Sequence, residues 1–299
     1  MTRWVVTGAG GQLGSCLVAR LRAKPGLQVQ GFERSQLDVT DGAALRAALR
    51  AFPGGAPDVV VNAAALTHVD RCETEPALAE AANALAPGVL AEECRALGAR
   101  LVHVSTDYVF DGAGQRPYRE DDPTGPRSVY GRTKLEGERR VRAALPGALV
   151  IRTAWVFGPG RNFVRTMLEA ADRALRGGGP ALRVVDDQRG SPTYSDDLAG
   201  ALIGLVEAGG AGTYHVANAG IATWWELARA AIDDWGHPEL PIAKVRTEEF
   251  PRPAPRPAWS VLDSGRAARL GIRVRPWREA LRAYLHSDAS PLRELGASS

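Results

Sequence analysis

The sequence has few cysteines, no long hydrophobic run and little net charge, and each shortage excludes a class of protein. No apolar run in the 299 residues approaches the roughly 20 that span a bilayer, so we expect no membrane partner. The 37 basic residues are scattered among 34 acidic ones, so the net charge of +3 offers no basic face to a nucleic acid. The three cysteines and five histidines lack metal-site spacing, so we expect no bound zinc. We expect a cytoplasmic protein, since the N-terminus shows no secretion signal.

Apolar runs alternate with helical patterns over the first half of the chain. One run, Val59-Val60-Val61, is wholly apolar, as expected for a parallel strand that is covered on both faces. This rhythm predicts the α/β class, with a Rossmann-type doubly wound parallel sheet in residues 1–152. Segments around 181–216 are expected to return to that sheet. Residues 153–180 and 217–286 are expected to form a smaller C-terminal α/β lobe that binds substrate, and 287–299 a flexible tail.

A glycine-rich turn follows the first apolar run of the chain. It reads Gly8-Ala-Gly-Gly11-Gln12-Leu13-Gly14 and lies between a predicted strand and a predicted helix. Glycine permits a tight turn and lets the backbone approach a pyrophosphate, and the helix N-terminus stabilises the negative charge. The turn therefore predicts a site for a dinucleotide, NADPH or NADH.

The residues after the second and third predicted strands are expected to contact the rest of this dinucleotide. Glu33 suits a free ribose 2′-hydroxyl and Arg34 suits a 2′-phosphate, so both cofactors stay open, with Arg34 favouring NADPH. Asp38 and Val39 are placed beside the adenine, although Asp38 is also a typical turn residue. The small side chains of Ala63, Ala64 and Ala65 leave room for the cofactor to lie across the sheet edge.

A tyrosine and a lysine, Tyr130 and Lys134, are four residues apart in Ser-Val-Tyr-Gly-Arg-Thr-Lys. On a helix this spacing puts both side chains on one face. An ammonium beside a phenol favours the phenolate, so we expect Lys134 to lower the pKa of Tyr130 and to bind the nicotinamide ribose. Tyr130 is then expected to protonate a carbonyl oxygen as hydride reaches its carbon.

A third polar element, Ser105-Thr106-Asp107-Tyr108, ends a predicted central strand. Open α/β sheets bind ligands at the carboxyl ends of their strands. The Thr106 hydroxyl is expected to bind or polarise the substrate carbonyl, whereas Asp107 and Asp111 are expected to organise the turn. Tyr108 either packs or lines the pocket of a sugar.

At these residues the chain resembles the dTDP-4-dehydrorhamnose reductase family, within the extended short-chain dehydrogenase/reductase superfamily. The resemblance runs from Val5 to about Leu285. Besides the glycine turn, its motifs are Leu37–Asp41, Asn62–Glu73, Ser105–Gly112, Tyr130–Gly137, Arg152–Gly158, Asp187–Thr193 and Arg256–Asp263. The combination of Ser-Thr-Asp-Tyr-Val-Phe with Asp-Gln-x-Gly-x-Pro-Thr is more specific for this family than the glycine turn or the Tyr130–Gly137 motif, which many relatives share.

The resemblance implies reduction of the 4-keto group of a dTDP-6-deoxy-4-ketohexose by the catalytic residues Thr106, Tyr130 and Lys134. It places Thr67 beside the cofactor. The residues that it places near the substrate are Val69, Asp70, Thr106, Tyr108, Trp155, Asn162 and Arg256. Some members of the family dimerise through magnesium held by a carboxylate just after the third glycine of the turn. That position is Ser15 here, so we expect no required metal and either a monomer or a homodimer.

Two other functions remain open at this point. A related nucleotide-sugar ketoreductase or an epimerase of a deoxysugar pathway would use the same three catalytic residues. A non-catalytic regulatory subunit is a different class of function, and intact Thr106, Tyr130 and Lys134 argue against it.

Overall fold

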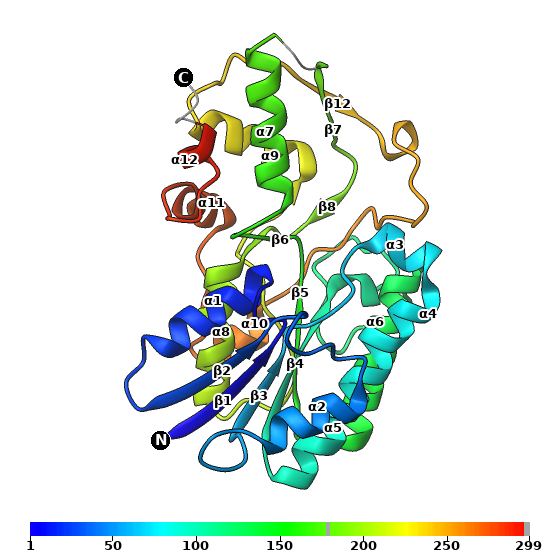
Figure 1. Ribbon diagram of the computed structural model, residues 1–299. Coiled ribbons are helices and arrows are strands. Elements are labelled where there is room, and N and C mark those ends of the chain that lie inside the picture. Colours follow the sequence, from blue (N-terminus) through cyan, green and yellow to red (C-terminus); the bar gives the residue numbers. More distant parts are fainter. Residues whose placement is uncertain (178–179, 296–299) are drawn as a thin grey trace.

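A six-stranded parallel sheet forms the centre of the protein (Figure 1), seen in a computed structural model that describes residues 1–177 and 180–295. Its strands in spatial order are β10 (Gly212–His215), β5 (Leu149–Thr153), β4 (Arg100–Thr106), β3 (Val59–Asn62), β1 (Thr2–Thr7) and β2 (Leu27–Phe32). All neighbouring strands are parallel. The chain passes from β1 to β2 on one side and then to β3 on the other, which confirms the Rossmann-type prediction. Ligands bind beside such a reversal, at the carboxyl ends of the strands.

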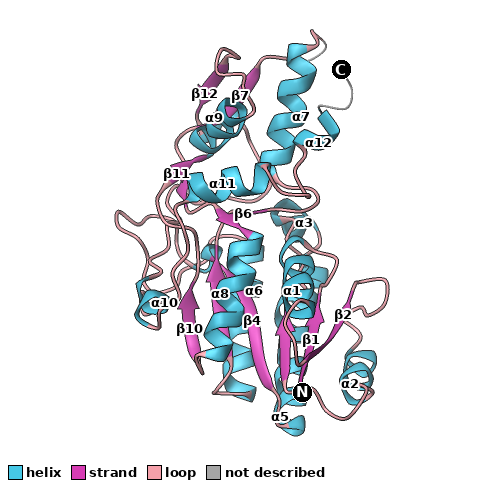
Figure 2. Ribbon diagram, turned by 90° about the vertical axis from the view of Figure 1, so that its left-hand side faces the viewer, coloured by secondary structure: helices cyan, strands magenta, loops and turns pink. Residues whose placement is uncertain are grey.

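Helices cover both faces of this sheet (Figure 2). On one face lie α1 (Gln12–Arg22) and α8 (Ser195–Glu207), and on the other α2 (Gly42–Arg50), α5 (Ala86–Leu97) and α6 (Val129–Ala144). Alternate residues of each strand supply the two cores, for example Val59 and Val61 on the first face and Val60 on the second. Both faces of β3 are therefore apolar, which explains its unbroken run of three valines.

A π-helical turn interrupts the helical stretch between β3 and β4. This stretch consists of α3 (Val69–Thr74), α4 (Pro76–Glu80), the π turn Ala81–Leu85 and then α5. Gly137 of α6 packs closely against the turn, because a Cβ at Gly137 would lie 2.1 Å from the carbonyl oxygen of Asn83. Single π turns of this kind occur frequently at functional sites.

A smaller lobe lies beyond the carboxyl ends of the strands, above the sheet in Figure 1. Its helices are α7 (Phe163–Leu175), α9 (Trp224–Asp234), α11 (Trp277–Leu285) and α12 (Leu292–Leu295). Its short strands pair as β6 (Val156–Phe157) with β9 (Thr193–Tyr194), β7 (Leu182–Val185) with β12 (Ile242–Val245), and β8 (Arg189–Gly190) with β11 (Ala222–Thr223). The lobe has its own core, in which Phe157, Leu168 and Tyr284 are buried.

The structure corrects the expected boundaries in two places. Of the segment 181–216, β10 joins the main sheet and α8 covers it, but β7 pairs with β12 in the smaller lobe because both strands pack beside α9. The expected tail includes the helix α12, which packs Leu292 and Leu295 against the core of the lobe and pairs Glu294 with Arg165. Residues 178–179 of the expected lobe and 296–299 of the expected tail lie outside the described residues.

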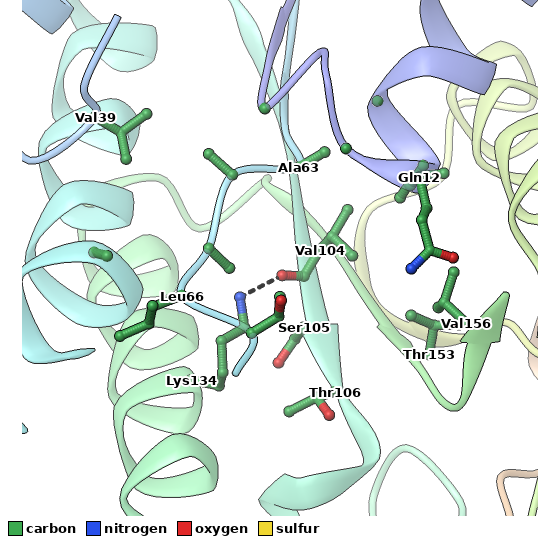
Figure 3. A pocket seen from close by; sticks show the side chains of 18 of the residues that line it. Gln12, Val39, Ala63, Leu66, Val104, Ser105, Thr106, Lys134, Thr153 and Val156 are labelled. Atoms are coloured by element: carbon green, nitrogen blue, oxygen red, sulfur yellow. Dashed lines mark hydrogen bonds between the residues drawn. The ribbon is translucent and has the colours of Figure 1, made fainter. Parts of the chain in front are cut away.

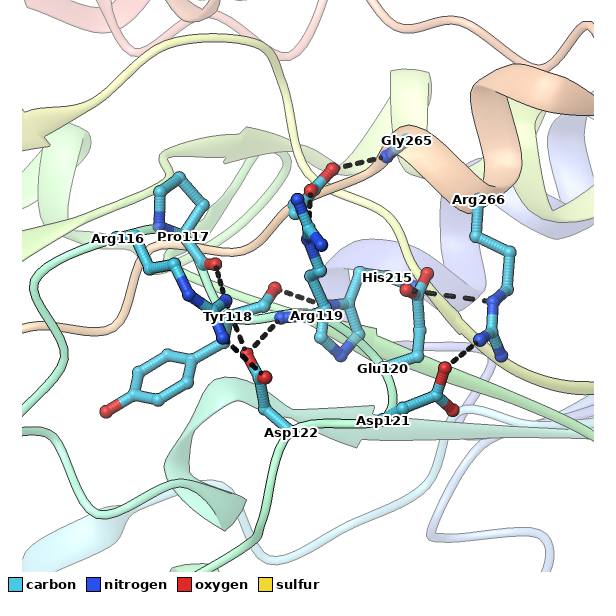
Figure 4. Close-up of polar contacts among 11 residues, drawn as sticks. Arg116, Pro117, Tyr118, Arg119, Glu120, Asp121, Asp122, His215, Gly265 and Arg266 are labelled. Atoms are coloured by element: carbon cyan, nitrogen blue, oxygen red, sulfur yellow. Dashed lines mark hydrogen bonds and ion pairs between the residues drawn. The ribbon is translucent and has the colours of Figure 1, made fainter.

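Ion pairs fasten the loop after β4 to the segment that follows β12 (Figure 4). Arg266, in the helix α10 (Gly265–Arg269), binds Asp121 at 2.5 Å and lies 3.8 Å from Glu120. Glu120 also accepts a hydrogen bond from the backbone N–H of His215 at 3.0 Å.

Within residues 1–177 and 180–295, every helix is too short or too polar to cross a lipid bilayer.

Candidate active site

One pocket of about 840 Å³ runs along the carboxyl ends of the central strands (Figure 3). This volume falls in the range of cofactor and substrate sites. Segments from the ends of β1, β2, β3, β4 and β5 line it, together with α6. Of the residues expected to bind cofactor or substrate, the lining contains Gly8, Gly11, Gln12, Leu13, Gly14, Arg34, Asp38, Val39, Ala63, Ala64, Ala65, Thr67, Val69, Thr106, Tyr108, Tyr130, Lys134 and Trp155.

The glycine turn at one end of the pocket leaves no room for side chains. Gly8 has a φ of +71°, and a Cβ there would lie 2.7 Å from the backbone nitrogen of Ala64. A Cβ at Gly14 would lie 2.1 Å from the carbonyl oxygen of Gly8. The first turn of α1 carries no acidic residue, so its free N–H groups and helix dipole suit an anion. This cradle fits the pyrophosphate of a dinucleotide.

The end of β2 forms the side of the pocket where the adenosine is expected. The Arg34 side chain is 69% exposed and its guanidinium lies 3.8 Å from the Asp38 carboxylate, so it is available to a phosphate. Asp38 also accepts hydrogen bonds from the backbone N–H and the hydroxyl of Thr40, at 2.9 and 2.7 Å, and these lower the pKa of its carboxyl. Asp38 thus forms a turn and lines the pocket. Glu33 folds over Gly10, where a Cβ would lie 3.1 Å from its carboxyl carbon.

The loop after β3 is held in place by a buried asparagine of the π turn. Asn83 accepts a hydrogen bond from the backbone N–H of Leu66 at 2.8 Å and donates one to its carbonyl at 3.1 Å. The amide of Asn83 also donates to the Thr133 hydroxyl of α6 at 3.3 Å. The small side chains of this loop therefore sit at a fixed position along the pocket wall.

Tyr130 and Lys134 lie buried on the face of α6 that is turned to the pocket. Ser128 is the N-cap of the helix, and its hydroxyl accepts a hydrogen bond from the N–H of Gly131 at 3.0 Å. Lys134 Nζ donates to the carbonyl oxygen of Val104 at 2.6 Å, so it lies against the end of β4 (Figure 3). Thr106 is buried two residues further along that strand.

Burial shifts the pKa values of Tyr130 and Lys134. The shift of Tyr130 is opposite to the one that we expected. Desolvation lowers the pKa of Lys134 to about 8, although nearby Glu138 opposes the shift. Desolvation also raises the pKa of Tyr130 above its usual value, despite a hydrogen bond with Thr106 that acts in the other direction. The prediction that Lys134 lowers the pKa of Tyr130 is therefore wrong for this structure, because burial dominates and the ammonium points to the Val104 carbonyl. Tyr130 carries its proton at neutral pH.

The loop after β4 combines turn formation with the pocket lining. Thr106 donates its hydroxyl hydrogen to Asp107 at 2.8 Å and accepts from the N–H of Tyr108 at 3.2 Å. Burial raises the pKa of Asp107 to about 6. The Tyr108 ring packs edge-on against Tyr130, with centroids 5.5 Å apart. Asp111 accepts hydrogen bonds from the N–H of Ala113 and the hydroxyl of Tyr118, so it organises the turn.

Two tryptophans form the wall of the pocket on the side of the smaller lobe. Trp155 has a φ of +45° and its ring stacks on Trp224, with centroids 3.6 Å apart. A Cβ at Gly190 would lie 2.3 Å from the Trp155 ring, so this glycine is needed for the ring to fit. Trp224 is fixed by its N–H, which donates to Gln188 at 3.0 Å. Gln188 and Gly190 of the motif Asp187–Thr193 thus support the tryptophan wall.

Three residues expected near the substrate are not among the described residues that line the pocket: Asp70, Asn162 and Arg256. Asn162 caps α7 and donates to the hydroxyl of Tyr284 at 3.0 Å, so packing explains it fully. Arg256 binds Asp70 at 2.9 Å, and this pair links α3 to the proline-rich segment 251–257. Burial raises the pKa of Tyr108, which lines the pocket; the charge of Arg256 opposes this shift and that of Asp70 adds to it.

Sequence reasoning assigned no role to several lining residues, including Thr153, Val156 and Trp224. Thr153 and Val156 lie in the motif Arg152–Gly158, so this motif could have indicated that they line the pocket. Trp224 lies in no motif that we identified. In the part of the chain that the structure describes, no group of three or more metal-ligating side chains occurs.

The fold and this pocket define a dinucleotide-dependent oxidoreductase of the short-chain dehydrogenase/reductase class. The family model described as the RmlD substrate binding domain matches residues 2–290, and the chain belongs to this family. It is 48% identical to the dTDP-4-dehydrorhamnose reductase of Mycolicibacterium smegmatis, over 93% of this chain and 84% of that protein. It is also 48% identical to a probable dTDP-4,6-dihydroxy-2-methyloxan-3-one 4-ketoreductase of Streptomyces antibioticus, over 94% and 93% of the two chains.

Among solved structures, the chain is similar to the dTDP-4-dehydrorhamnose reductase of Bacillus anthracis, which was determined in complex with NADP. The TM-score is 0.87 at 32% identity, and the match covers 95% of this chain and 99% of that one. The resemblance to the dTDP-4-dehydrorhamnose reductase family that the motifs indicate is thereby confirmed.

Proposed function

We propose that this protein reduces the 4-keto group of a dTDP-6-deoxy-4-ketohexose at the expense of NADPH or NADH. The favoured reaction converts dTDP-4-dehydro-L-rhamnose to dTDP-L-rhamnose. The observation that carries the proposal is the convergence of Thr106, Tyr130 and Lys134 in one pocket that begins at a glycine cradle. The proposal includes the cytoplasmic location expected from the sequence.

The pocket residues fit a dinucleotide along its whole length. The glycine turn would hold the pyrophosphate, the end of β2 the adenosine, and Lys134 the nicotinamide ribose. Among the residues that line the pocket, Gln12 and Thr153 each have a side-chain oxygen that is buried without a hydrogen-bond partner among the described residues. Buried polar atoms are normally paired, so such atoms indicate where a polar ligand binds. Exposed Arg34 favours NADPH, because it can pair with a 2′-phosphate.

When bound in this pocket, reduced nicotinamide would supply the hydride that reduces C4 of the sugar. Tyr130 donates its phenolic proton to the carbonyl oxygen, so the ketone gains one hydride and one proton and becomes an alcohol. Its raised pKa keeps that proton in place until the oxygen becomes basic. Thr106 holds the carbonyl oxygen beside Tyr130, and Lys134, whose ammonium donates to the Val104 carbonyl, would position the cofactor through the nicotinamide ribose.

The substrate is assigned to the side of the pocket that faces the smaller lobe. Val69, Tyr108 and Trp155 line this side and offer an apolar and aromatic surface to a deoxysugar. Arg256 is assigned to the nucleotide diphosphate, since guanidinium groups pair well with phosphate. Such a diphosphate would compete with Asp70 for this guanidinium.

The second candidate is reduction of a different dTDP-ketosugar with the same catalytic residues. The 48% identity to the Streptomyces antibioticus ketoreductase favours this alternative over an epimerase or a regulatory subunit. This second reaction has a different sugar as its substrate, and the roles of Thr106, Tyr130 and Lys134 are the same.

The test is the loss of absorbance of NADPH and of NADH in parallel, with dTDP-4-dehydro-L-rhamnose as the substrate. Rapid oxidation with dTDP-L-rhamnose as the product supports the proposal and gives the cofactor preference. Oxidation only with another dTDP-4-ketohexose would move the assignment to the second candidate. Bound NADPH without oxidation of any ketosugar would contradict both.

A further inference from the structure

Thr153 places a buried hydroxyl without a partner in the wall of the pocket. It is the last residue of β5 and is only 6% exposed. Its Oγ1 has no hydrogen-bond partner in the part of the chain that the structure describes. Leaving a buried hydroxyl unpaired destabilises the folded protein, so packing alone does not account for a threonine here. Valine has the same shape and would avoid this cost.

The position of Thr153 points to the reactive end of the dinucleotide. Thr153 pairs in register with Thr106 on the neighbouring strand β4, so the two threonines lie at the same depth in the pocket. Figure 3 places Thr153 and Val156 on the side of Gln12 and of the glycine turn, across the cavity from Lys134. A nicotinamide ring whose ribose binds Lys134 would therefore lie between Lys134 and Thr153.

We propose that the Thr153 hydroxyl binds the carboxamide of the nicotinamide, an inference that rests on the proposed function. The carboxamide is the polar substituent of that ring, and it carries both a carbonyl acceptor and an amide donor. A threonine hydroxyl can donate to the first or accept from the second. With the ribose at Lys134 and the carboxamide at Thr153, one face of the ring is directed toward Thr106 and Tyr130. Thr153 thus selects the ring face from which hydride leaves.

The test variant is Thr153→Val, which removes the hydroxyl and keeps the shape of the side chain. NADPH affinity is measured by fluorescence titration without a sugar substrate, so the readout does not depend on turnover. Losing one hydrogen bond to a buried ligand group weakens binding about tenfold. The melting temperature of the free protein is expected to stay the same or to rise, because the lost hydroxyl has no partner there. Thr153→Ser, which retains the hydroxyl, is expected to bind NADPH as the wild type does.

Two controls separate this contact from a general distortion. The ligand 2′-phospho-ADP-ribose lacks the nicotinamide, so wild type and Thr153→Val are expected to bind it equally. The matched variant is Thr193→Val, because Thr193 is buried like Thr153 but donates its hydroxyl to the Ser191 carbonyl at 3.1 Å. This variant is expected to lower the melting temperature and to leave NADPH affinity unchanged.

Three outcomes would overturn the inference. Unchanged NADPH affinity in Thr153→Val, with a raised KM for the ketosugar, would assign the hydroxyl to the substrate. Equal weakening of NADPH and 2′-phospho-ADP-ribose would mean that the substitution disturbs the whole site. Failure of the wild type to bind any dinucleotide would contradict the proposed function itself, and the titration identifies that failure directly.

Discussion

Burial fixes the protonation of the two central residues of the site. Tyr130 and Lys134 are both buried on one face of α6, and desolvation favours the neutral form of each. A protonated phenol can donate a proton to a substrate oxygen. A lysine whose pKa is about 8 keeps its charge at neutral pH and loses it under mildly alkaline conditions.

Removing the phenolic hydroxyl of Tyr130 is expected to abolish proton donation without disturbing the fold. In Tyr130→Phe the ring still packs against Tyr108, so we predict NADPH affinity within about twofold of the wild type. Loss of a general acid lowers kcat by roughly 10²–10⁴-fold. Steady-state kinetics and a binding titration measure the two effects separately. Near wild-type turnover of Tyr130→Phe would show that another group supplies the proton.

Cofactor affinity is expected to depend on pH through Lys134. Because burial lowers the pKa of Lys134 to about 8, its ammonium is present below that pH and is lost as pH rises through it. We therefore predict that NADPH binds more weakly at pH 9 than at pH 7, as measured by fluorescence titration. Lys134→Met should bind weakly at both pH values, whereas Tyr130→Phe should keep the dependence. A flat profile for the wild type would refute the ribose contact of Lys134.

At the scale of elements, a buried ion pair joins α6 to β4 and β5 behind the catalytic residues. Glu138 on α6 is 0% exposed and binds the 4% exposed Arg152 of β5 at 2.8 Å. Glu138 also accepts the Ser105 hydroxyl of β4 at 2.6 Å and binds Arg142 at 2.6 Å. These contacts hold the pKa of Glu138 below its usual value despite burial. They fix the distance between Lys134 and the strand ends.

Replacing this glutamate is expected to be far more costly than replacing its exposed neighbour. Glu138→Ala leaves the Arg152 guanidinium buried without its partner, which costs about 3–5 kcal/mol. Glu136 lies on the same helix, is 35% exposed and pairs with Arg140, so Glu136→Ala should cost only about 0–1 kcal/mol. Denaturant unfolding of both variants gives the comparison. Equal losses would mean that the Glu138 network does not join the elements.

The parts of the site that follow local rules could be predicted from the sequence. The glycine turn, the small residues after β3 and the Tyr130–Lys134 spacing each depend on one element and its neighbour. The Trp155–Trp224 stack depends on how the smaller lobe meets the sheet, and no local pattern encodes the positive φ of Trp155. The pKa of Tyr130 was wrongly predicted from spacing because burial is a property of the folded molecule.

At the scale of the molecule, the pocket lies between a sheet that would hold the cofactor and a lobe assigned to the sugar. The proline-rich segment 251–257 reaches from the lobe to α3, where Arg256 binds Asp70 at 2.9 Å. The backbone N–H of Ala254 also donates to Asp70 at 3.2 Å. This contact holds the segment against α3 and leaves the Arg256 side chain 20% exposed, and we propose that a diphosphate recruits it.

Removal of that arginine is expected to weaken substrate binding alone. A charge-assisted hydrogen bond contributes about 1.5–3 kcal/mol, so we predict that Arg256→Gln raises the KM for the nucleotide sugar by roughly tenfold or more. NADPH affinity should not change. Arg252→Gln is the matched control, because Arg252 is 59% exposed and 3.9 Å from Asp70. An equal change of KM in both variants would contradict the assignment of Arg256 to the nucleotide diphosphate.

Hydride transfer to C4 of a dTDP-ketosugar is measured with two samples of NADPH, one deuterated at each of the two nicotinamide C4 positions. Each labelled cofactor is incubated with the enzyme and dTDP-4-dehydro-L-rhamnose, and the product is analysed by NMR. Hydride transfer to C4 gives dTDP-L-rhamnose with one deuterium at sugar C4 from one of the two samples. Unlabelled product from both samples, or deuterium at another carbon, would contradict hydride transfer to C4.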